Sequence, residues 1–152
     1  VTGAAYGAKN RKAFDRAVRL TTEFSVIFGL ICGALIFGIG WLVIPVLSAD
    51  PAVQDSARTF LPYSALAPVV GFAAWQLDGI FIGTTRTREM RNAGIVAVLI
   101  YIGLHFTFEP WLGGHGIWIA FLGYYIMRAF TLAVYYPGLT RYLDVNYADK
   151  DR

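Results

Sequence analysis

The charged residues of this chain leave four long stretches free of Asp, Glu, Lys and Arg. These stretches lie between Glu23 and Asp50, between Arg58 and Asp78, between Arg91 and Glu109, and between Glu109 and Arg128. A helix needs ~20 largely apolar residues to cross a hydrocarbon core about 30 Å thick. We therefore predict four membrane-spanning segments near residues 24–47, 60–83, 92–108 and 116–136.

The composition supports this interpretation, since 57% of the 152 residues are hydrophobic and only 15% are charged. Soluble domains have roughly 45 to 50% apolar and about 25% charged residues. The apolar runs are continuous rather than alternating, which favours helices over barrel strands, because a helix satisfies its own backbone hydrogen bonds in lipid. The sequence predicts an all-α membrane protein with four transmembrane helices.

The basic residues predict the orientation. Eleven Lys and Arg residues lie before the first span, between the second and third spans or after the fourth, whereas only Arg58 lies in the other two connections. Positive charge stays on the cytoplasmic side during insertion, so both ends are expected in the cytoplasm. The net charge of +3 then reflects contact with lipid headgroups rather than with nucleic acid.

Three regions follow from these positions. Residues 1–22 are predicted to be a cytoplasmic connection in which Phe14, Ala17 and Val18 form the apolar face of an amphipathic helix on the membrane surface. Residues 23–140 are the four-helix membrane segment, and residues 141–152 are a cytoplasmic tail. At the outer side, Asp50 and Pro51 are typical of a helix start, and we expect a short separate helix over residues 51–59.

Two charged residues are predicted to lie within the bilayer. A charge at the centre of a membrane helix costs ~2.5 to 3.5 kcal/mol, so Asp78 and Arg128 are expected to face protein or water. The span boundaries separate them by about 9 Å along the helix axes, which an arginine stem could partly close in a direct or water-bridged pair. Arg86 is a second candidate partner for Asp78. The pair could either order the bundle or take part in a proton or substrate path.

Glycines mark places where helices can approach each other closely. Gly29 and Gly33 have the small-xxx-small spacing and predict close packing within the bundle. Gly79 and Gly83 are expected to let another helix approach the inner end of the second span. Cys32 is the single cysteine and is expected to act as a small apolar residue.

Three further residues could hold a metal ion or a proton, although interfacial hydrogen bonding is the more common role of such groups. His105 and Glu109 are one helical turn apart, and His115 follows across a short connection. No cofactor motif and no cluster of nucleophile, base and orienting residue is visible, which argues against an enzyme.

The segment "LDGIFIGTTRTREMRNAG" resembles the end of the tenth helix in the DinF-like branch of the multidrug and toxic compound extrusion (MATE) transporters. The residues that carry the likeness are Asp78, Gly79, Gly83, Thr85, Arg86, Met90 and Arg91. The segment "YGAKNRKAF" at the front resembles the connection between helices eight and nine of that family. The resemblance implies that the four spans are helices nine to twelve of a twelve-helix transporter with two six-helix lobes.

The resemblance also implies a function. It implies export of amphipathic organic cations from a bacterial inner membrane, coupled to proton or sodium entry, without a cofactor, by lobes that rock about a central cavity. The partners are the rest of the transporter and the lipid bilayer. The coupling carboxylate of this branch lies in the N-terminal lobe, so no coupling role is carried over to Asp78.

Phe72, Trp75 and Gly79 fall near one face of the second span. The resemblance places this helix beside the central cavity, where Phe72 and Trp75 are candidates for cation-π contact with cargo, although packing against neighbouring helices is the more common role. An alternative function is a complete small four-helix membrane protein that acts as a homo-oligomeric exporter or as a scaffold. Val1 in place of methionine argues against that alternative.

Overall fold

The computed structural model describes residues 1–148, and these residues form helices without any strand. Four of the helices are long and apolar enough to cross a membrane, which confirms the predicted all-α membrane fold. The helices in chain order are α1 (Thr2–Gly7), α2 (Arg11–Leu47), α3 (Pro51–Gly83), α4 (Thr87–Leu112) and α5 (Gly114–Ala148).

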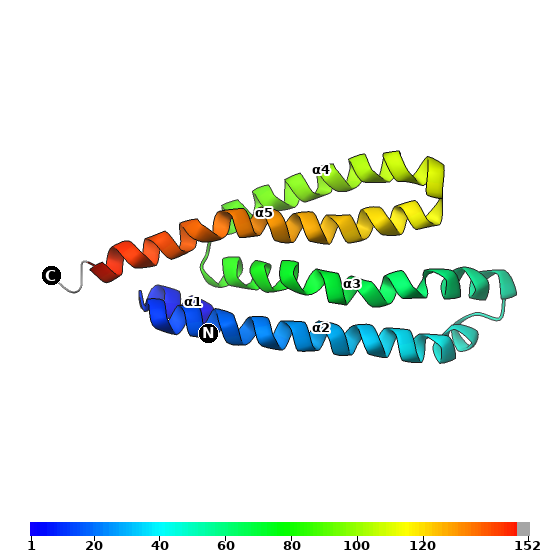
Figure 1. Cartoon of the computed structure of the whole chain (residues 1–152), viewed down its shortest axis with the longest axis horizontal. Coiled ribbons are helices and arrows are strands. Elements are labelled where there is room, and N and C mark those ends of the chain that lie inside the picture. The colour runs from blue at the N-terminus through cyan, green and yellow to red at the C-terminus, as the bar shows by residue number, and fades with distance from the viewer. Residues whose placement is uncertain (149–152) are drawn as a thin grey trace.

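The four long helices lie side by side in one row, in the order α2, α3, α5, α4 (Figure 1). The α2–α3 and α4–α5 connections both lie at one end of the row, which we call the outer end. The N-terminus, the α3–α4 connection and the far end of α5 lie at the opposite, inner end. This antiparallel arrangement has the alternation that the charge pattern predicted; the assignment of the inner end to the cytoplasm stays a prediction.

The predicted amphipathic helix on the membrane surface does not form as a separate element. Asn10 caps α2 by accepting a hydrogen bond from the Ala13 amide, and α2 then continues without a break to Leu47. Phe14 and Ala17 are buried, so the apolar face that we expected to contact lipid packs against protein instead. The division into regions 1–22, 23–140 and 141–152 is not tested by these contacts and stays a prediction.

The predicted short helix over residues 51–59 is also wrong as a separate element. Asp50 does cap the helix start, since its Oδ1 accepts a hydrogen bond from the Ala52 amide, and Pro51 is in the first turn. The helix then runs through Pro62 and Pro68 to Gly83. Extending a helix costs less than nucleating a new one, which explains why the outer turns join the span.

Close packing at Gly29 and Gly33 is confirmed. A Cβ on Gly29 would lie 2.8 Å from the Pro68 carbonyl oxygen, and one on Gly33 would lie 2.7 Å from the Ala65 carbonyl oxygen. Real Cβ atoms do not approach so closely, so these glycines let the α2 and α3 backbones meet. Such small-residue contacts are typical of helix association in lipid.

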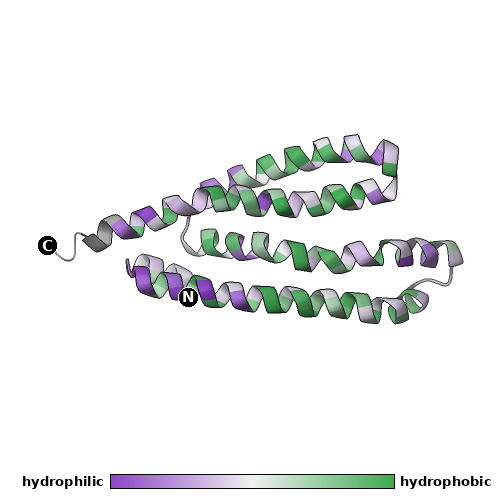
Figure 2. Cartoon of the chain, in the orientation of Figure 1, coloured by the Kyte–Doolittle hydropathy of each residue, from purple (hydrophilic) through white to green (hydrophobic). Residues whose placement is uncertain are grey.

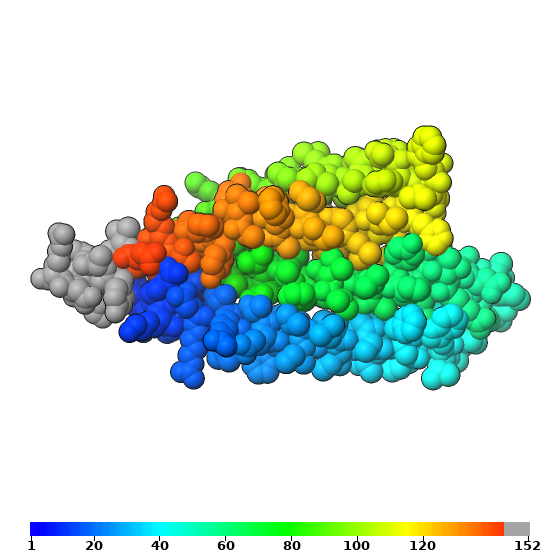
Figure 3. Space-filling model, viewed as in Figure 1, coloured from blue at the N-terminus to red at the C-terminus, as the bar shows by residue number. Residues whose placement is uncertain are grey.

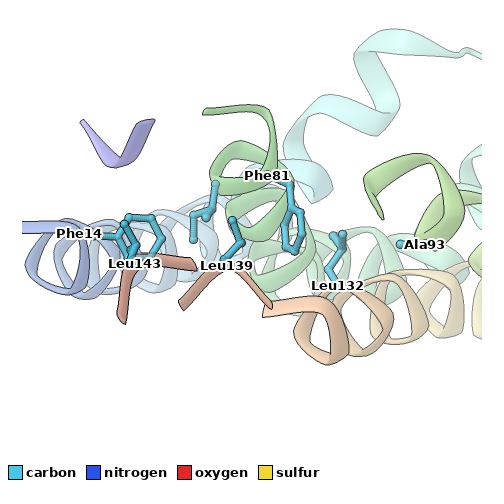
Figure 4. Close-up of a cluster of buried hydrophobic side chains, with 7 residues drawn as sticks. Phe14, Phe81, Ala93, Leu132, Leu139 and Leu143 are labelled. Atoms are coloured by element: carbon cyan, nitrogen blue, oxygen red, sulfur yellow. The ribbon is translucent and has the colours of Figure 1, made fainter. Parts of the chain in front are cut away.

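The large buried side chains gather toward the inner end. The cluster, which we call the inner core, joins α2, α3, α4 and α5 and is drawn in Figure 4. Its members are Phe14, Ile80, Phe81, Ala93, Leu132, Leu139 and Leu143. Phe14, Phe81 and the three leucines are fully buried. Toward the outer end, the buried residues are mostly smaller, such as Ala65, Ala97 and Ala120.

Hydrophobic residues occupy most of the length of the four long helices (Figure 2), which pack side by side in the space-filling view (Figure 3). On α4, Ile95, Leu99 and Phe106 are exposed, as side chains that face lipid would be. Polar residues are concentrated on the inner turns of α2 (Figure 2). This pattern is the one expected for a bundle with lipid around its middle and water at its ends.

Candidate functional site

Asp78 on α3 and Arg128 on α5 form a direct ion pair. Arg128 Nε donates to Asp78 Oδ2 and Arg128 Nη2 donates to Asp78 Oδ1, each at 2.9 Å. The two side chains are only 13% (Arg128) and 17% (Asp78) exposed. Two parallel charge-assisted bonds of this kind are the strong geometry for arginine and carboxylate. The direct form of the predicted pair is therefore the one present.

A glycine on α4 makes room for the guanidinium. A Cβ on Gly94 would lie 2.9 Å from Arg128 Nη1. Tyr124, one turn before Arg128 on α5, also interacts with the guanidinium. Three helices therefore meet at the ion pair.

Arg86, the other predicted partner of Asp78, is engaged elsewhere. Its Nη1 donates to Glu89 Oε1 at 3.2 Å, and a Cβ on Gly138 would lie 3.4 Å from the same nitrogen. Arg86 therefore packs beside α5 at the α3–α4 connection. Arg91, the other arginine of the motif, is exposed on α4.

Only one of the two motif glycines is approached by another segment. No atom lies within 4 Å of a Cβ built on Gly79, so the expected contact is absent there among residues 1–148. At Gly83 a Cβ would lie 3.3 Å from Thr2 Oγ1 and 3.4 Å from the Gly3 amide nitrogen. The approaching segment is therefore α1, which caps the inner end of α3, and not a neighbouring span.

Aromatic rings connect the ion pair region to the outer end. We call this set the aromatic column, and its members are Tyr63 and Trp75 on α3 with Trp118, Phe121 and Tyr125 on α5. Successive ring centroids lie 5.5 Å apart for Trp75 and Tyr125, 5.0 Å for Tyr125 and Phe121, 5.9 Å for Phe121 and Trp118, and 6.1 Å for Trp118 and Tyr63.

Sequence reasoning missed the aromatic column. The spacing of Trp118, Phe121 and Tyr125 places the three rings on one face of α5, and this was the available signal. That face is directed toward α3, which the sequence did not reveal. Trp75 and Tyr125 meet edge to face, which is a favoured arrangement for aromatic pairs.

The three residues considered for a metal or proton site do not come together. His115 Nδ1 lies 3.0 Å from the Tyr63 hydroxyl, and its ring lies 5.2 Å from that of Phe60. His105 Nε2 lies 3.3 Å from Glu109 Oε2 on α4. Within residues 1–148, no three His, Cys, Asp or Glu side chains are close enough to share a metal ion.

Phe72 and Trp75 line a hollow of about 230 Å³ between α2 and α3. The residues around this α2–α3 hollow are Ser25, Phe28, Gly29, Phe72, Trp75 and Gln76. Trp75 is 46% exposed there, although its ring also packs against Tyr125. The two aromatic candidates therefore line the same hollow, and Gly79 is not part of it. Their contact with cargo stays a prediction.

Comparisons with known proteins agree with the resemblance seen in the sequence. The family model described as MatE matches residues 1–107. The DNA damage-inducible protein F of Escherichia coli (strain K12) is 33% identical over 132 residues, which cover 87% of this chain. The aligned region spans only 28% of that relative. No solved structure gives a significant match.

The match to the family model and the similarity to the E. coli protein cover the helices that hold Asp78, Trp75 and the glycine–arginine motif. They also agree with the four apolar helices of the structure. The chain therefore belongs to the MATE (MatE) family of membrane transporters.

Proposed function

We propose that this chain forms part of a secondary active multidrug exporter. The exporter exchanges amphipathic organic cations for protons or sodium ions by alternating access of two lobes. Family membership is the observation that carries this proposal, and it also favours a transporter over an enzyme. The alternative of a complete four-helix exporter or scaffold has no specific observation in its favour.

The contacts between these helices indicate what they contribute to transport. In alternating access, lobes move largely as rigid bodies around a site. The inner core joins four helices, and the Asp78–Arg128 pair joins α3 to α5 within the membrane. We propose that the ion pair keeps this part of the lobe rigid while the lobe moves.

The same geometry argues against Asp78 as the site of the coupling ion. Both of its carboxylate oxygens accept hydrogen bonds from Arg128. Protonation would remove one of these acceptors, and a sodium ion would have to compete with a tethered cation. We propose that the coupling proton or sodium ion binds elsewhere in the full-length transporter, as the family resemblance implies.

The proposed location is the bacterial inner membrane with both ends of this segment in the cytoplasm. Single cysteines test the orientation, with Cys32 first changed to alanine. Lys12→Cys at the inner end and Val53→Cys at the outer end are both exposed. In intact cells an impermeant maleimide should label Val53→Cys and should label Lys12→Cys only after lysis. The reverse pattern would contradict the proposed orientation.

The function is tested with the full-length transporter in bacteria that lack their major efflux systems. We expect it to lower ethidium accumulation, and we expect an uncoupler or removal of the sodium gradient to abolish the effect. Ethidium accumulation equal to that in the empty-vector strain, with the protein present in the membrane, would contradict the proposal. Export by residues 1–152 alone would instead support the alternative of a small complete exporter.

A further inference from the structure

The α2–α3 hollow contains a polar group that its neighbours hold in one orientation. The Gln76 side-chain amide nitrogen donates to Thr22 Oγ1 and to the Val18 carbonyl oxygen on α2. Since the carbonyl oxygen of Val18 can only accept, the nitrogen of Gln76 must be the atom directed to α2. The Oε1 atom of Gln76 is therefore the atom of this amide that is not bonded to α2.

This oxygen is available to a ligand. Among residues 1–144, whose side chains the structure describes, no group donates a hydrogen bond to it, and Gln76 is only partly buried. Gln76 lines the α2–α3 hollow next to Phe72 and Trp75. Because its amide nitrogen is already bonded to α2, the Gln76 side chain can accept a hydrogen bond without a large cost in side-chain entropy.

Two glycines pack against the aromatic residues of the hollow. A Cβ on Gly71 would lie 3.2 Å from the Trp75 indole, so the ring lies against the bare backbone at that glycine. On the opposite wall, a Cβ on Gly29 would lie 3.3 Å from Phe72 Cβ. Gly29 thus lets the α2 backbone pack against the base of the Phe72 side chain, and both aromatic residues line the hollow.

We propose that Gln76 is a specificity-determining residue that accepts a hydrogen bond from planar aromatic cations bearing N–H groups. The rings of Phe72 and Trp75 attract the positive charge through their π faces, and no charged side chain lines the hollow to oppose it. A hollow of about 230 Å³ holds the aromatic head of such a ligand rather than the whole molecule. The inference rests on the proposed function.

Two dyes separate hydrogen bonding from charge. Ethidium is planar and carries amino N–H donors, whereas tetraphenylphosphonium is an aromatic cation without any N–H group. In the full-length transporter, Gln76→Leu should lower ethidium export roughly three- to tenfold, the effect of one lost hydrogen bond, and leave tetraphenylphosphonium export unchanged. Thr22→Val, which removes one of the two groups that orient Gln76, should lower ethidium export by a smaller factor.

Gln54→Leu is the matched control. Gln54 donates to the Ser48 carbonyl oxygen at the outer end, away from the hollow. Its replacement should therefore leave the ratio of ethidium export to tetraphenylphosphonium export unchanged. If Gln76→Leu lowers the export of both dyes equally, the inference is overturned and Gln76 is assigned to the α2–α3 contact. Unchanged export of both dyes would also overturn it.

Binding distinguishes this inference from the proposed function. Ethidium fluorescence is measured with the purified full-length protein, and Gln76→Leu should raise its Kd roughly three- to tenfold. If the wild-type protein binds ethidium in this Gln76-dependent way but exports neither dye, the specificity role stands and the proposed function fails. If Gln76→Leu binds as tightly as the wild-type protein, the specificity role is overturned, whatever the flux assays give.

Discussion

The inner end and the middle of this bundle are packed in different ways. At the inner end Phe14, Leu139 and Leu143 are fully buried, and all three lie outside the predicted spans. In the middle, α2 meets α3 through Gly33 and Ala65, with backbone close to backbone. The difference follows from the solvent expected at each place, because burying large apolar side chains is favourable in water, whereas lipid offers them an equally apolar alternative.

The ion pair adds a third kind of contact, which suits lipid for another reason. Helices in lipid gain little from the hydrophobic effect, so close packing and polar pairing select their neighbours. Asp78 and Arg128 neutralise each other's charge, so neither side chain has to be solvated by water. A bundle of this kind should therefore respond differently to substitution in its three contact regions.

The largest effect is expected when one member of the ion pair is removed. Asp78→Leu or Arg128→Met leaves a buried charge without its partner, and we expect a loss of about 3 to 5 kcal/mol in folding free energy. The double variant Asp78→Leu/Arg128→Met should recover most of this loss. Folded yield and thermal stability of the full-length transporter in detergent measure it. Equal loss in the single and double variants would mean that shape, not charge, matters at this site.

The second largest loss of stability is expected in the inner core. Leu139→Ala should cost about 2 to 4 kcal/mol, because Leu139 is fully buried and its removal leaves a cavity. Leu99→Ala is the matched control, since Leu99 is 63% exposed on α4 and should change the stability by less than about 0.5 kcal/mol. Similar losses in the two variants, measured by thermal unfolding in the same detergent, would remove the distinction between core and lipid-facing leucines.

The glycine contact should respond to added volume. Gly33→Ala forces α2 away from α3 and should cost about 1 to 3 kcal/mol. Gly38→Ala on the same helix is the control, because no atom lies within 4 Å of a Cβ built there, and it should be neutral or slightly stabilising. A stable Gly33→Ala protein would show that the α2–α3 contact relaxes more easily than its geometry suggests.

The smallest effect is expected at the surface link between α2 and α5. Arg11 donates to Asp144 Oδ1 at 2.8 Å, but the Asp144 side chain is 61% exposed. Exposed pairs contribute little, so Asp144→Asn should cost less than about 1 kcal/mol, and the loss should shrink further in high salt. Thermal unfolding at low and high salt checks this, and a large loss that does not depend on salt would mean that Asp144 has a structural role beyond the pair.

Much of the fold could be predicted from local features of the sequence. The charge-free stretches predicted four spanning helices, and the small-residue spacing at Gly29 predicted close packing, which the structure confirms. The motif around Asp78 and Gly83 predicted the family, which the comparisons confirm. These features depend on residues near one another in the chain, so composition and spacing are enough to recognise them.

The lateral arrangement of the helices was decided by the tertiary structure alone. Hydropathy distinguishes lipid from water but does not say which helix lies beside which, so the sequence left both Arg128 and Arg86 as partners for Asp78. Only the placement of α3 against α5 selected Arg128 and aligned Trp75 with Tyr125. The sequence by itself determined which segments enter the membrane, because transfer to lipid is a property of each segment. Packing between segments then determined the ion pair, the aromatic column and the hollow, because each of these needs side chains from two helices that are far apart in the chain.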